Sequence, residues 1–149
     1  MASFTFVFDN VKPNALVTIP PVGAGLVISQ LGAIQGTASD GVALQRIEVR
    51  IKRNDAVNLF WDPGNYNAND LLKFIRGEAD NGAWFPALGF INWSTGTFPS
   101  DFFKNSQNYS VHARSIDKAG NTSVISAATF TFTTDLPTSF VTAPSTRAI

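Results

Sequence analysis

Cysteine is absent from this chain, and so is any excess of charge of one sign. Without cysteine there is no disulfide framework, no thiolate nucleophile and no cysteine-based zinc site. Eleven lysines and arginines balance eleven aspartates and glutamates, so no long-range field attracts nucleic acid or an anionic membrane. The 149 residues suffice for one domain that buries its core without a disulfide or a metal.

Long apolar runs are missing as well. No stretch approaches the roughly 20 apolar residues that cross a bilayer, and the start Met1–Phe4 lacks the basic and apolar regions of a signal peptide. We therefore expect no membrane insertion by this segment. Because residues 4–8 already alternate like a strand, we expect the chain to belong to a longer polypeptide whose export signal lies upstream.

Helical periodicity is scarce, and an alternation of apolar and polar residues takes its place. Ile47, Val49 and Ile51 share one face of a predicted strand from Leu44 to Lys52. The charged residues between them are expected to form a solvated face. A short helix fits only over residues 70–77, where an aspartate cap and a terminal glycine bracket two turns.

Three further segments alternate in the same way. The sets predicted to point inward are Ile34, Gly36 and Ala38; Tyr109, Val111 and Ala113; and Phe130 and Phe132. His112 falls on the opposite face of its strand and is expected at the surface. Residues 117–121 carry the glycine and asparagine of a hairpin turn. Short strands separated by turns predict an all-β, antiparallel sandwich.

The two ends of the chain repeat each other. Residues 2–9 read ASFTFVFD and residues 128–135 read ATFTFTTD. Such self-similarity indicates tandem modules, although two unrelated Phe/Thr strands would give similar letters. We interpret 1–13 as the last strand of a preceding repeat plus a joint, 14–135 as one module, and 136–149 as a linker toward the next repeat. Without its own sheet, the first strand is expected to be disordered, docked on a sheet edge or paired with another molecule.

Two internal motifs strengthen this interpretation. Residues 109–121 read YSVHARSIDKAGN, which resembles the Y-x-V-x-A-x-A-x-D-x-A-G-N signature of bacterial Ig-like tandem repeat domains. Residues 34–42 read IQGTASDGV and resemble the I-x-G-x-A-x-D opening of the same domains. The chain departs from the plain pattern because residues 54–105 form a long stretch and no tryptophan lies on the strand that begins at Leu44.

The resemblance implies an Ig-like β-sandwich with an enlarged, aromatic-rich central insertion. Such domains form arrays on large secreted or cell-surface bacterial proteins, often adhesins, so the implied location is extracellular or at the cell surface. The implied partners are neighbouring Ig-like repeats in the same chain, together with a glycan or another host or cell-surface ligand. Tyr109 would be the tyrosine-corner residue of the fold, since it precedes the inward-facing Val111 by two positions.

Most of the aromatic residues fall within the central stretch, and two interpretations of them stay open. Flat rings beside amides and carboxylates are typical of a carbohydrate-binding face. The candidate glycan-binding residues are Trp61, Tyr66, Trp84 and Trp93. The alternative is that the rings fill the core, because large aromatics are mostly buried.

Acidic residues near the expected joints suggest a calcium site. Ca²⁺ takes several oxygen ligands from loops, and an ion at a joint would stiffen a stalk of modules. The candidate ligands are Asp9, Asp40, Asp117, Asn121 and Asp135. Aspartates in turns also cap backbone amides without any metal, so this interpretation competes with a purely structural one.

Catalysis finds little support in the sequence. His112 is the sole histidine, and no serine or cysteine motif is placed to use it. The carboxylates of the central stretch show no spacing that fixes a glycosidase pair. The sequence therefore predicts a module that is not an enzyme and acts as a spacer or presenting scaffold, with carbohydrate binding as the alternative.

Overall fold

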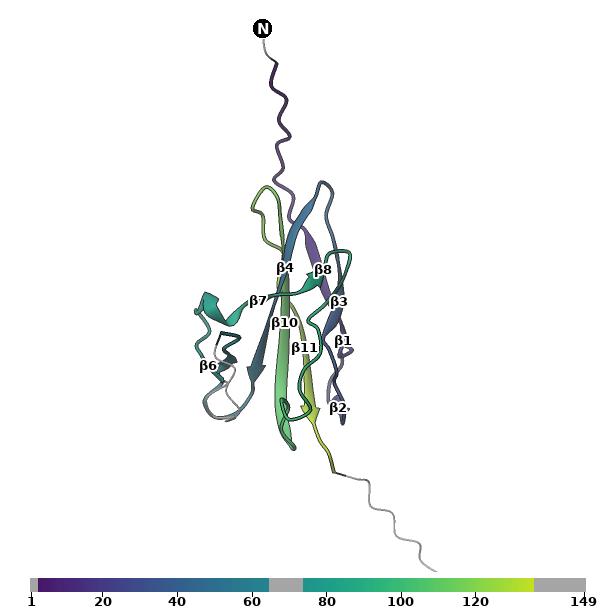
Figure 1. The fold of residues 1–149 in the computed structure, drawn as a ribbon, viewed down its shortest axis with the longest axis vertical. Coiled ribbons are helices and arrows are strands. Elements are labelled where there is room, and N and C mark those ends of the chain that lie inside the picture. Colours follow the sequence, from purple (N-terminus) through teal and green to yellow (C-terminus); the bar gives the residue numbers. More distant parts are fainter. Residues whose placement is uncertain (1–2, 65–73, 136–149) are drawn as a thin grey trace, which may run out of the picture.

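The computed structural model describes residues 3–64 and 74–135, which form two β-sheets packed face to face (Figure 1). The four-stranded sheet has the order β1 (Asn14–Ile19), β3 (Gln35–Ser39), β9 (Asn92–Ser94) and β8 (Leu88–Gly89). The seven-stranded sheet has the order β2 (Val27–Ile28), β11 (Ser126–Phe132), β10 (Gln107–Asp117), β4 (Leu44–Arg53), β5 (Phe60–Trp61) and β6 (Phe74–Arg76), with β7 (Phe85–Pro86) also paired to β4.

The strand order is that of an immunoglobulin sandwich. In that fold one sheet holds the first, second, fifth and fourth strands, and the other holds the third, sixth and seventh. Here β1, β3, β9 and β8 form the first set, and β4, β10 and β11 form the second. All described pairs are antiparallel except the short pairing of β2 with β11. The predicted all-β, Ig-like architecture is therefore confirmed.

The predicted inward residues do form the core. Ile47, Val49 and Ile51 on β4 are fully buried, and so are Tyr109 and its alternate neighbours on β10. The remaining members of the predicted set are also buried: Ile34, Gly36, Ala38, Phe130 and Phe132. Alternation is a reliable guide here because both long strands have one face against the opposite sheet.

A group of aromatic rings closes the end of the core that lies opposite the N-terminus. Phe102 and Phe103 come from the loop before β10 and are buried, and Phe103 packs against Tyr109 at a ring distance of 5.1 Å. The hydroxyl of Tyr109 accepts a hydrogen bond of 2.9 Å from the backbone N–H of Lys104. This back-reaching bond is the tyrosine corner expected from the sequence.

The charged face of β4 is not the solvated surface that alternation predicts. Residues of the central insertion cover part of it, and Arg50 is only 5% exposed. Its guanidinium lies 4.1 Å from the ring of Phe60 and bonds to Glu78 at 2.6 Å. His112, expected at the surface, is half-buried beside it. The prediction was wrong because alternation shows that two faces differ and does not show what covers the polar one.

The central insertion contains no α-helix in its described part. Of the helix predicted over residues 70–77, the structure describes residues 74–77. Residues 74–76 form β6, which pairs with β5. Residues 65–73 lie outside the described part of the chain, so that portion of the prediction is untested. A short 3₁₀ turn, η2 (Asn81–Ala83), is capped by Asp80, whose carboxylate accepts the N–H of Gly82.

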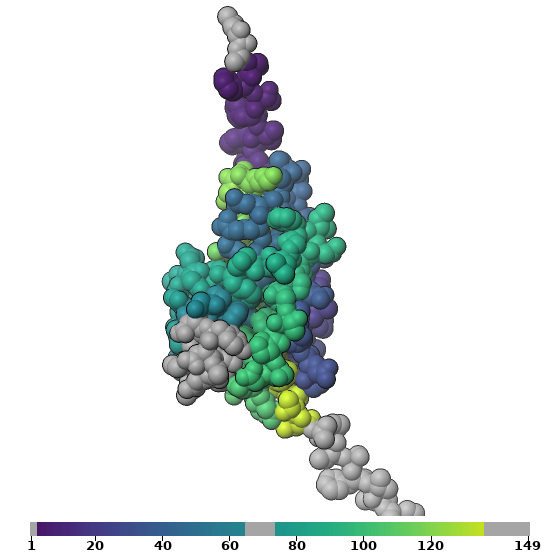
Figure 2. All heavy atoms as spheres, viewed as in Figure 1, coloured from purple at the N-terminus to yellow at the C-terminus, as the bar shows by residue number. Residues whose placement is uncertain are grey.

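The two ends leave the sandwich at opposite poles. Residues 3–13 form no strand and extend from one pole along the long axis, as the purple segment of Figures 1 and 2 shows. Phe4, Phe6 and Phe8 on this segment are 91%, 84% and 80% exposed. β11 carries the chain to the other pole (Figure 1). No helix among the described residues is long and apolar enough to cross a membrane.

Candidate metal centre

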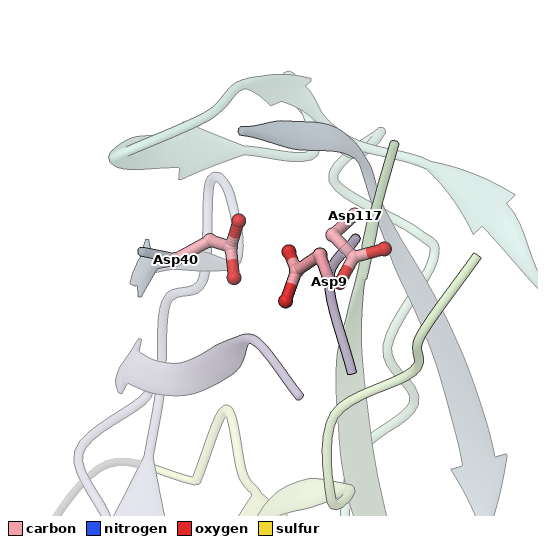
Figure 3. A group of neighbouring side chains, drawn as sticks. All are labelled: Asp9, Asp40 and Asp117. Carbon is pink, nitrogen blue, oxygen red and sulfur yellow. The ribbon is translucent and has the colours of Figure 1, made fainter. Parts of the chain in front are cut away.

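Three carboxylates from distant parts of the chain meet at the pole from which residues 3–13 extend. Asp40 directly follows β3, Asp117 is the last residue of β10, and Asp9 lies on the N-terminal segment. One oxygen from each lies within 4.8 Å of the other two. Figure 3 shows the carboxylates of Asp9 and Asp40 facing each other, with Asp117 beside Asp9.

Asp117 is fixed by the turn that it begins. Its Oδ1 accepts the backbone N–H of Asn121 at 2.8 Å, and its Oδ2 accepts the side-chain amide of Asn121 at 2.8 Å. Burial opposes the negative charge, but the hydrogen bonds from Asn121 and from the backbone of Ala119 and Gly120 lower the pKa of Asp117 below its ordinary value. The buried carboxyl is therefore held as an anion.

Asn121 also attaches the N-terminal segment to this pole. Its side-chain amide donates to the backbone carbonyl of Asp9 at 3.1 Å as well as to Asp117. The carboxylate of Asp9 in turn accepts the N–H of Val11 at 2.9 Å. The hydrogen bonds of this one asparagine therefore place Asp9 beside Asp117.

Asp40 contributes an oxygen that lacks a donor. Its Oδ2 accepts the N–H groups of Val42 and Ala43 at 3.0 and 2.7 Å, which caps the turn after β3. Its Oδ1 is buried and has no hydrogen-bond partner. A buried carboxylate oxygen without a partner is costly, and a bound cation would remove that cost.

The arrangement fits a calcium ion in size and chemistry. Oxygens that ligate one Ca²⁺ at about 2.4 Å lie no more than about 5 Å apart, and the three carboxylates satisfy this limit. Three nearby carboxylates also repel one another unless a cation lies between them. Lys118, which the sequence analysis did not single out, lines the same surface hollow as Asp9 and is a competing source of positive charge.

Of the five candidate calcium ligands, the structure brings four together and separates one. Asp9, Asp40, Asp117 and Asn121 share one pole, whereas Asp135 follows β11. There its carboxylate accepts the side-chain amide of Asn105 at 3.0 Å. In the terminal repeat Asp135 occupies the position of Asp9. The similar segments 2–9 and 128–135 thus place their last aspartates at opposite poles.

The structure describes three of the four candidate glycan-binding residues and buries one of them. Trp93 is 2% exposed and lies in the core, so its ring is not available to a sugar. Trp61 is half-buried, with Phe85 and Phe102 at ring distances of 4.9 and 5.1 Å. Trp84 is half-buried beneath the guanidinium of Arg114, and Tyr66 lies outside the described residues. The described rings mostly fill the core and its margins, the second interpretation that the sequence left open.

The strand order defines an immunoglobulin-like β-sandwich. No protein-family model matches the sequence, and no curated protein matches it. Among solved structures the chain is similar to murine CRIg, with 11% identity, a TM-score of 0.35, and coverage of 83% of this chain and 98% of that one. A likeness this weak carries no argument, so the class rests on the strand order.

Proposed function

We propose that this chain is a structural module of a multi-domain, secreted or cell-surface bacterial protein, in which it spaces or presents another part. The proposal includes a calcium ion at the joint with the preceding module, held by Asp9, Asp40 and Asp117. No catalytic role is needed. The observation that carries the proposal is the convergence of a linker aspartate with two aspartates of the sandwich at one pole.

The position of the cluster supports a role in fixing module orientation. A flexible joint lets neighbouring modules swing, because few contacts cross it. Asp9 precedes β1, in the segment that we interpret as the joint, and Asp40 and Asp117 belong to the sandwich. An ion that binds all three would tie the linker to the sandwich. Chain ends at opposite poles suit an extended array (Figure 1).

The experiment uses a two-module chain made of residues 1–135 followed directly by residues 10–149. In this chain the first copy of Asp135 occupies the place of Asp9 at the internal joint. Small-angle X-ray scattering, with excess calcium and with EDTA, measures the maximum dimension and the spread of shapes. We expect calcium to lengthen the two-module chain and to narrow its distribution of shapes.

The same residue provides a matched control within that chain. Asp135→Asn in the first copy is expected to abolish the calcium response, and Asp135→Asn in the second copy to preserve it. Asparagine keeps an acceptor oxygen and removes the charge, so local folding is little changed. Scattering curves that do not respond to calcium, or that respond equally in both variants, would contradict the proposal.

A further inference from the structure

The N-terminal segment repeats the residue types with which β11 packs into the core. Residues 2–6 read ASFTF, and residues 128–132 of β11 read ATFTF. In β11 the alanine and both phenylalanines, Ala128, Phe130 and Phe132, point into the core and are 2%, 1% and 6% exposed. The same three residue types recur in the segment at the same spacing. A strand built from residues 2–6 would therefore place the same residue types at the core positions that Ala128, Phe130 and Phe132 occupy.

The outward contacts of β11 are matched as well. Thr129 Oγ1 lies 3.0 Å from Ser110 Oγ, and Thr131 Oγ1 accepts the side-chain amide of Asn108 at 3.1 Å. The corresponding residues are Ser3 and Thr5, which carry the same hydroxyl function. Nothing in residues 2–8 interrupts a ladder, since none of them is proline.

Strand direction prevents the segment from replacing β11 in its own molecule. β10 runs toward the pole where Asp9 is held, and β11 runs away from it (Figure 1). Folded back onto β10, residues 2–8 would also run toward that pole and would lie parallel to β10. The place of β11 requires an antiparallel strand. The segment therefore fits this place only in a second molecule.

We propose that residues 2–6 of one molecule enter the β11 position of a second molecule, between its β2 and β10, whenever the resident β11 is displaced. In the intact chain the tethered β11 has the advantage of a high effective concentration and keeps the incoming segment out. Once β11 is lost, Phe4 and Phe6 exchange almost complete exposure for the core that Phe130 and Phe132 occupied. The inference depends neither on the metal nor on the proposed array.

The geometry predicts end-to-end assembly rather than a closed dimer. The incoming strand leaves the acceptor at the pole opposite the acceptor's N-terminal segment. The acceptor's own segment therefore stays free to enter a third molecule (Figures 1 and 2). A head-to-tail contact of this kind leaves one free pole after each addition, so molecules add in succession until the rotation between neighbours closes a ring. The assembly would reproduce without covalent joints the succession of modules that the terminal repeat indicates.

The test displaces β11 in the full-length chain by the double substitution Phe130→Asp and Phe132→Asp. Near-UV circular dichroism of the tryptophans reports native packing, and light scattering after size exclusion reports mass, both over a range of concentrations. We expect a chain that is unfolded when dilute and that gains native signal and mass together as concentration rises. Adding Phe4→Asp and Phe6→Asp is expected to abolish this recovery.

A matched control separates strand entry from general stickiness. Val7→Asp with Phe8→Asp adds the same charge and removes exposed apolar side chains next to the segment, at positions equivalent to Thr133 and Thr134 outside the core. This control, placed on the β11-displaced chain, is expected to assemble. The proposal is overturned if the β11-displaced chain regains no native signal at any concentration, if it is native as a monomer, or if the two N-terminal double variants behave alike.

Discussion

Burial changes the chemistry of single side chains on the covered face of β4. Arg50 satisfies its guanidinium by donating from Nε to His112 Nδ1 at 3.1 Å and from Nη1 to the backbone carbonyl of Glu78 at 3.0 Å, besides its ion pair with the Glu78 carboxylate. A buried charge persists only when it is paired and hydrogen-bonded. The neutral imidazole of His112 is one of the acceptors that make this possible.

The state of His112 makes stability depend on pH. Burial first, and then the charge of Arg50, lower the pKa of His112 from 6.5 to about 4. As pH falls below 6.5, His112 becomes protonated in the unfolded chain, whereas in the folded chain it is not protonated until about pH 4. The stability that depends on neutral His112 is therefore full above pH 6.5 and declines as pH falls toward 4. Urea unfolding at pH 7 and pH 5 is expected to show this loss.

His112→Gln provides the comparison for this prediction. Glutamine offers Arg50 an acceptor oxygen and does not titrate. The wild-type chain is expected to lose more free energy of unfolding than the variant between pH 7 and 5. Most carboxylates titrate below this interval, so they affect both chains little. Equal losses in the two chains would mean that His112 titrates normally in the folded state.

At the scale of elements, the long strands could be predicted and the insertion could not. β4 and β10 are long enough to repeat their alternation several times, and the hairpin turn after Asp117 has its own chemical signature. The strands of the insertion have two or three residues each, too few to show a period. Their pairing depends on contacts far along the chain, such as Arg50 with Glu78, which no local pattern encodes.

The candidate metal-binding and glycan-binding residues could likewise be predicted from the sequence only in part. The sequence analysis chose Asp9, Asp40 and Asp117 because they lie near the expected joints, and Asp117 also begins a predicted hairpin turn. Sequence order could not show that Asp9 and Asp135 belong to different poles, because that depends on the direction in which β11 runs. Nor could it show that Trp93 is placed in the core by its pairing with β3.

Gly36 illustrates how tightly the four-stranded sheet is packed. A Cβ on this residue would overlap the backbone carbonyl of Leu16 on β1 and the indole of Trp93 on β9. Gly36→Ala must therefore displace both the β1 backbone at Leu16 and the indole of Trp93. We expect a loss of about 1–3 kcal/mol in the free energy of unfolding, measured as a lower urea midpoint with an unchanged slope.

Gly41→Ala is the matched control for that substitution. A Cβ on Gly41 meets no atom within 4 Å, so the same chemical change is expected to leave the urea midpoint nearly unchanged. Similar urea midpoints for the two variants would show that the close contacts of Gly36 with Leu16 and Trp93 do not set the stability cost of Gly36→Ala.

At the scale of the whole molecule, the sandwich and its N-terminal segment contribute differently to stability. Every strand of both sheets lies between Asn14 and Phe132, among the described residues. The segment before them exposes its phenylalanines and reaches the body through hydrogen bonds such as that from Asn121 to Asp9. Stability should therefore come from the sandwich, and the segment should matter only when a ligand connects the two.

Deleting residues 1–9 separates these contributions. In EDTA the shortened chain is expected to melt at nearly the temperature of the full chain, because no core contact is lost.

With calcium in large excess, the full chain should gain about 2.7 kcal/mol if the ion is present at a hundred times its dissociation constant. The shortened chain lacks the carboxylate of Asp9 and should gain much less. Asp135→Asn, which removes the equivalent aspartate at the other pole, should retain the full gain. Scanning calorimetry measures all three; a large drop of the shortened chain in EDTA would assign residues 1–9 to the sandwich itself, and equal calcium gains in all three would remove Asp9 from the metal centre.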